Sequence, residues 1–257
     1  MPAQTQATGP TLRSHSGAPS ATPAVHPPES LTRLLMQWGV RTAAPAGPLA
    51  EQLGGWLGWA DAVRLSQVLS MEPTQAPAGE PVGQTPAFDA AEAALNRLQT
   101  ELSLAFEAPE LARDAAASGP PAAPLADLLA PLRWHHAQQQ RRMAARVAGL
   151  RAQLREHLVG ATPALAAVAA LDAVFERVLA APEQQRLAGL PAVLTRRAEQ
   201  HHATDPRHSH RHIAADLQRL LRAELDLRLQ PLRALVEALP RPAHPAHPHP
   251  PTCLVTE

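Results

Sequence analysis

The feature that most constrains the fold is a run of apolar residues at helical spacing from residue 213 to 239. At about 100° per residue, its large apolar side chains gather on one face, and two further leucines widen that face to roughly half of the circumference. The residues concerned are Leu217, Leu220, Leu221, Leu225, Leu232, Leu235, Val236 and Leu239, with Leu227 and Leu229 on the flanks. A surface helix of a small domain needs a narrower face, so we expect at least two partner helices to pack against this one.

Two charged residues, Glu224 and Arg228, lie in the middle of this apolar face. They are spaced i, i+4 with the acid first, which is the favourable order for a helical ion pair. We expect them to be half-buried together. Pro231 follows, and it lacks the N–H that a helix interior uses. We therefore expect either a kink at Pro231 or a helix that stops and restarts with this proline in its first turn.

Between its two ends, the chain has a composition that favours helix over sheet. This part is rich in Ala, Leu, Arg, Gln and Glu, while the full sequence has no Tyr and only 3% aromatic residues. We predict an all-α protein, built as an antiparallel helical bundle with long C-terminal helices. We divide it into a disordered tail (1–29), an N-terminal helical region (30–113), a linker (114–124), a C-terminal bundle (125–239) and a disordered His/Pro-rich tail (240–257).

Caps and prolines set the predicted helix boundaries. Ser30 begins a short helix that Gly39 closes, and Thr162 with Pro163 begins another that Pro182 ends. Asp205 and Pro206 cap the last helix. The other predicted helices cover residues 49–70, 88–106, about 125–158 and about 187–202. We expect Trp56 and Trp59 of the helix at 49–70 to pack in the core and anchor this helix to the rest of the protein, and the alternative is a stacking platform for a ligand.

Apolar residues between 143 and 158 recur in a pattern close to a coiled-coil seam. They are Met143, Val147, Leu150, Leu154 and Leu158. The same helix carries an arginine stripe, formed by Arg141, Arg142, Arg146, Arg151 and Arg155. Such a stripe suits nucleic-acid phosphates, an anionic membrane surface or an acidic partner. The alternative is a solvated face that pairs with the acidic helix at 88–106.

A histidine-rich connection before the last helix offers a second candidate site. His208 and His212 are spaced i, i+4, and His202 could complete a transition-metal site with them. The alternative is a set of solvated histidines. Asp172 and Glu176 form a carboxylate pair, which we interpret as part of an exposed helix face. No motif of nucleotide binding, metalloprotease or hydrolase chemistry is present, so we predict neither an enzyme nor a cofactor.

Four segments carry a family resemblance. They are LTRLL at 31–35, EQLGGWLGWADAVRLSQVLS at 51–70, LDAVFERVLAAPEQQRLAGLPAVLTRR at 171–197 and LRAELDLRLQPLRALVEAL at 221–239. Together they resemble a family of uncharacterised proteobacterial proteins, mostly from beta-proteobacteria, that share a domain of unknown function. The resemblance implies a cytoplasmic helical protein without an assigned activity, linked by association to a cell-envelope complex.

From the residues, our leading hypothesis is a non-enzymatic helical adaptor or assembly protein. Its binding surface would be the apolar face of the last helix, together with the seam between residues 143 and 158. The face residues expected to contact a partner helix or a second copy are Leu217, Leu221, Glu224, Leu225, Arg228 and Leu232. We expect a cytoplasmic location, since no apolar run reaches the roughly 20 residues of a spanning helix. Nucleic-acid binding and metal binding are the alternatives.

Overall fold

The computed structural model describes residues 30–41, 47–70, 85–107 and 124–240, and every secondary-structure element in these ranges is an α-helix. The predicted all-α fold is therefore confirmed. The helices are α1 (Leu31–Gln37), α2 (Leu49–Trp56), α3 (Trp59–Leu69), α4 (Thr85–Leu104), α6 (Leu125–Ala161), α7 (Pro163–Leu187), α8 (Leu190–Thr204) and α9 (Ser209–Ala238). The predicted tails and linker lie outside the described residues, except at their edges.

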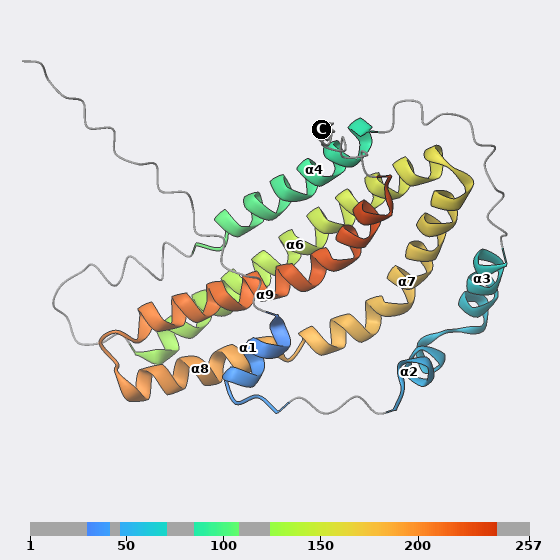
Figure 1. Cartoon of the computed structure of the whole chain (residues 1–257). Helices are drawn as coiled ribbons and strands as arrows, with labels where there is room; N and C mark the ends of the chain where they lie inside the picture. The colour runs from blue at the N-terminus through green and yellow to red at the C-terminus, as the bar shows by residue number, and fades with distance from the viewer. Residues whose placement is uncertain (1–29, 42–46, 71–84, 108–123, 241–257) are drawn as a thin grey trace, which may run out of the picture.

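Helix α9 is the element on which the bundle is assembled. Helices α1, α4, α6 and α8 all pack against it. Figure 1 shows α9 lying along α6, with both helices running in the same direction. Helices α7 and α8 connect the end of α6 to the start of α9 and run in the opposite direction, as does α4. The expectation of at least two partner helices is confirmed.

The core follows the predicted apolar face of α9. Eight of its buried residues are Ile213, Leu217, Leu220, Leu221, Leu225, Leu229, Leu232 and Leu235, and the same cluster includes Leu34 of α1, Leu102 of α4, Leu132 of α6 and Leu194 of α8. The α6 seam also faces inward: Met143, Val147, Leu154 and Leu158 are buried, and Leu150 packs against them. The seam therefore closes on helices of its own chain.

Local caps explain several helix ends. The Ser30 side chain accepts a hydrogen bond from the Arg33 N–H, and Gly39 leaves α1 at a φ of 72°, a left-handed conformation that favours glycine. The Thr162 side chain accepts from the Leu165 N–H, with Pro163 in the first turn of α7. These predicted caps are confirmed.

Prolines interrupt fewer helices than we expected. Pro182 does not end α7, which continues to Leu187, and Pro231 stays inside α9 without a restart. Because burial of Leu187 and of the α9 face holds both sides of each proline in place, packing outweighs the lost backbone hydrogen bond. Pro191, in contrast, lies in the first turn of α8, where its missing N–H costs nothing.

The last helix begins later than predicted. It starts at Ser209 with His208 as the residue before it, so Asp205 and Pro206 precede it rather than cap it. Asp205 instead accepts hydrogen bonds from the backbone N–H groups of Arg207 and His208, as Asp side chains do in turns.

The helix predicted at 49–70 is broken in two. Leu57 is extended, with a ψ of 114°, and Gly58 precedes α3 with a ψ of 160°. Three glycines in this stretch each weaken a helix by about 1 kcal/mol relative to Ala, which makes a break inexpensive. The two short helices pack on the outer side of α7.

None of the helices in the described ranges has both the length and the apolar character that crossing a membrane requires.

The core position of α9 yields a stability prediction. Leu221→Ala removes a side chain with no exposed surface, so we expect the free energy of unfolding to fall by about 2–5 kcal/mol. The exposed Val159 provides the control, because Val159→Ala should change it by less than about 0.5 kcal/mol. Urea unfolding monitored by circular dichroism measures both. Equal effects of the two substitutions would contradict the central role of α9.

Candidate functional site

A buried carboxylate joins three helices. Glu224 on α9 has no exposed surface. Its Oε1 accepts hydrogen bonds from Gln140 Nε2 at 2.9 Å and Arg228 Nη2 at 2.8 Å, and His136 Nε2 lies 3.3 Å from Oε2. Gln140 and His136 belong to α6, while Arg228 Nη1 reaches Glu183 Oε1 on α7 at 3.6 Å. The cluster therefore connects α6, α7 and α9.

The charge on Glu224 is held by these neighbours. Burial acts to raise the pKa of this carboxyl group, because it penalises the charged form. The contacts with His136 and Arg228 outweigh that effect, so the pKa of Glu224 lies below its ordinary value. The predicted ion pair with Arg228 is confirmed, but Glu224 is fully buried rather than half-buried. The partners from α6 and α7 were not predicted, since nothing in local spacing indicates them.

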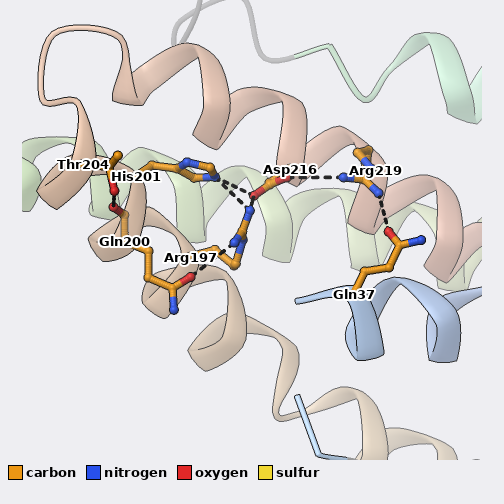
Figure 2. Close-up of polar contacts among 7 residues, drawn as sticks. All are labelled: Gln37, Arg197, Gln200, His201, Thr204, Asp216 and Arg219. Atoms are coloured by element: carbon orange, nitrogen blue, oxygen red, sulfur yellow. Dashed lines mark hydrogen bonds and ion pairs between the residues drawn. The ribbon is translucent and has the colours of Figure 1, made fainter. Parts of the chain in front are cut away.

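A second cluster surrounds Asp216, which is also buried on α9. Arg197 Nε donates to its Oδ2 at 3.0 Å, and His201 Nε2 lies 2.8 Å from the same oxygen. Arg219 Nη1 lies 3.9 Å from Oδ1 and donates through Nη2 to Gln37 Oε1 at 2.9 Å. Figure 2 shows these side chains converging from α1, α8 and α9. The cluster thus ties α1 and α8 to α9.

The arginine stripe of α6 is mostly paired within the chain. Arg142 and Arg146 contact Glu101 of α4 at 3.2 and 2.6 Å, and these bonds hold the pKa of Glu101 below its ordinary value. Arg151 and Arg155 form a ladder with the α7 carboxylates Asp172 and Glu176. The Arg151–Asp172 pair is bidentate, with distances of 2.8 and 2.7 Å, and Arg155 donates to Glu176 at 2.6 Å.

These pairs correct one interpretation of the sequence and confirm another. Asp172 and Glu176 are not an exposed face, because they bind arginines across the contact between α6 and α7. The pairing of the stripe with the acidic helix is confirmed for Arg142 and Arg146 through Glu101. Arg141 is exposed on the same helix.

The histidines proposed as metal ligands have separate partners. His208 Nδ1 lies 2.8 Å from Asp205 Oδ2, which holds the pKa of Asp205 below its ordinary value. The His212 ring stacks on His201 with centroids 5.1 Å apart, and His202 Nδ1 lies 3.4 Å from Ser209 Oγ. Within the described ranges, no group of three His, Cys, Asp or Glu side chains is arranged to hold a metal ion.

The predicted interaction face of α9 is covered by the chain itself. Leu217, Leu221, Leu225 and Leu232 are buried in the core together with Glu224, and Arg228 is half-buried. The periodicity of apolar residues indicates that other helices must pack on this face of α9, but it does not identify those helices. The structure shows that the covering helices are α1, α4, α6, α7 and α8. The apolar face of α9 is therefore not open to another protein.

Helix α3 leaves one apolar side uncovered. Trp59, Ala62, Ser66 and Leu69 follow at intervals of three, four and three residues, which places them on one side of the helix. All four are exposed, Trp59 to 85% and Leu69 to 68%. We call these four residues the α3 seam. The expectation that both tryptophans pack in the core is wrong for Trp59, while Trp56 is half-buried beneath the Arg186 guanidinium.

A different side of α3 holds it to the bundle. Asp61, Leu65 and Val68 are half-buried on that side, and Asp61 Oδ1 lies 3.0 Å from Arg177 Nε on α7. No residue of α3 is buried. The helix is therefore anchored by one side and presents the α3 seam on another.

The Glu224 cluster makes stability dependent on pH. A carboxyl group with a depressed pKa contributes stability above its unfolded pKa of about 4.3, and this stability is lost as the pH falls through the lower folded value. We expect Glu224→Gln to cost about 3–5 kcal/mol at neutral pH, because it removes the buried charge that Arg228 contacts at 2.8 Å and leaves this arginine with only the more distant Glu183. The variant should also lose part of the decline in stability between about pH 5 and pH 3.

Urea titrations at several pH values test this expectation, with the exposed Glu156→Gln on α6 as the control. The control should keep both the neutral stability and the pH profile of the wild type. A Glu224→Gln protein whose stability falls with acid as steeply as the wild type would contradict the assignment.

Comparison with known proteins places the chain in a family. Searches found no match among curated proteins and none among solved structures. A family described as Protein of unknown function (DUF3348) matches residues 20–241, a span that includes every helix described above. The expected resemblance to an uncharacterised domain family is therefore confirmed, and the chain belongs to the DUF3348 family.

Proposed function

We propose that this protein is a non-enzymatic helical adaptor that binds other protein chains through helix–helix contacts. The observation that carries the proposal is the α3 seam. Exposed apolar patches on folded proteins mark interaction sites, and tryptophan is enriched among the residues that dominate binding energy. Trp59 and Leu69 lie exposed on one side of a helix that the chain anchors by another side.

The charged clusters inside the bundle support a structural rather than a chemical role. Glu224 joins α6, α7 and α9, Asp216 joins α8 to α9, and the arginine ladder joins α6 to α7. The charged side chains of each cluster have their partners on the helices that the cluster connects. The proposal therefore assigns these groups to the fold and the α3 seam to the partner.

No observation favours nucleic-acid binding to the same degree. Four arginines of the α6 stripe already bind carboxylates of α4 and α7, which removes much of the charge available for phosphates. A cytoplasmic location and a link to a cell-envelope complex stay predictions from the sequence.

Site-specific photo-crosslinking in the native cells tests the adaptor role. We expect p-benzoylphenylalanine in place of Trp59 to form covalent adducts with protein, because the side chain lies on the α3 seam and the substitution keeps an aromatic group there. The control carries the same group in place of Gln67, an exposed residue on the polar side of α3. Denaturing gels and mass spectrometry identify the adducts.

Adducts that form at position 59 and not at position 67 would support the proposal. Equal adducts at both positions would indicate random collisions, and their absence at both positions would remove the α3 seam as a docking surface for protein.

A further inference from the structure

The spacing of the α3 seam is that of a coiled-coil contact. Intervals of three, four and three residues place Trp59 and Ser66 at a positions of a heptad and Ala62 and Leu69 at d positions. These are the positions at which two helices interlock. The α7 side of α3, which carries Asp61, uses different positions.

The four side chains follow the order large, small, small, large about the middle of the helix. Positions 59 and 69 are both five residues from Arg64, and positions 62 and 66 are both two residues from it. If a second α3 lies antiparallel, Trp59 meets Leu69 of the second copy and Ala62 meets Ser66 of the second copy. The two small residues then let the helices approach closely, while the large ones fill the space at both ends.

The charges of α3 permit this pairing and do not select a charged partner. Its charged residues are Asp61 and Arg64. Asp61 is held by Arg177 of α7 at 3.0 Å, and Arg64 lies on the side of the helix opposite the α3 seam, by the 100° rotation per residue. Val63 and Leu65 occupy the e and g positions, where charges usually specify a different partner chain. The positions that flank the α3 seam therefore carry no charge that would disfavour a second copy of the same helix.

We propose that two copies of this chain associate through the α3 seam, with their α3 helices antiparallel about a two-fold axis at the level of Arg64. This inference rests on the proposed function, because it takes the α3 seam to be a docking surface. A C2 interface uses the same patch on both subunits, as this one does. The 11 residues of α3 span about 16 Å. Stable interfaces bury about 800 Å² per partner, more than one such helix offers, so the dimer is weak and depends on concentration.

Disulfide crosslinking of the full chain tests the geometry. In a Cys253→Ser background, one protein carries Ala62→Cys and another carries Ser66→Cys. We expect the equimolar mixture to form a mixed disulfide between copies, because these positions face each other in the antiparallel pair. Either protein alone should form little disulfide-linked dimer. The two copies of position 62 are offset by about 6 Å along the helix axes, and the distance between the helices adds to this offset, so the two thiols are too far apart to form a disulfide.

The matched control is Gln67→Cys, exposed on the polar side of α3, which should not crosslink with any of the others. Crosslinking of Ala62→Cys alone as fast as the mixture would indicate parallel helices and overturn the proposal. Crosslinking of Gln67→Cys at the same rate would show collisions only and would also overturn it.

Sedimentation equilibrium of variants without added cysteines provides the second measurement. We expect the wild type to shift from monomer to dimer with increasing concentration, Trp59→Ala to remain monomeric, and Gln67→Ala to match the wild type. A wild type that is monomeric at every concentration overturns self-association. If photo-crosslinking at position 59 then captures a different protein, the adaptor role stands and only the choice of partner fails.

Discussion

The bundle depends on one buried carboxylate and the groups that keep it charged. Glu224 sits within an apolar face, where an unpaired charge would cost several kcal/mol. Its partners come from α6 and from its own helix, and Arg228 extends the contact to α7. A one-residue slide or a rotation of α9 would separate these atoms. Leucines alone would tolerate such shifts, so the charge cluster fixes the register in which the apolar faces meet.

Similar contacts repeat along the bundle, each at a different pair of helices. Asp216 holds α8 and, through Arg219 and Gln37, also α1, whereas the ladder of Arg151 and Arg155 holds α6 to α7. These clusters are less buried than Glu224 and have access to water, which lowers their energetic contribution. Their main effect is to specify which helices are neighbours. The outermost helices, α2 and α3, have fewer such contacts, and it is there that apolar surface remains exposed.

Local patterns predicted the helices well and their surroundings poorly. The period of 3.6 residues located the apolar face of α9 and the seam of α6, and cap chemistry located the starts at Ser30 and Thr162. What covers each face was not predictable, because it depends on contacts such as Arg219 with Gln37, 182 residues apart in sequence. For the same reason we assigned the α9 face to a partner and Trp59 to the core. The structure reverses both assignments. The long apolar face of α9 is buried within the chain, and the exposed apolar side belongs to α3, a short helix whose tryptophan we expected in the core.

The position of α9 along the chain affects how the protein is made. It is the last of the described helices, yet α1, α4, α6 and α8 all pack against it. During translation these earlier helices leave the ribosome before the helix that covers their apolar sides exists. Contacts across such long separations slow folding, and exposed apolar faces bind other chains non-specifically. The nascent protein therefore passes through a stage in which these apolar faces are uncovered, and this stage ends only when α9 emerges.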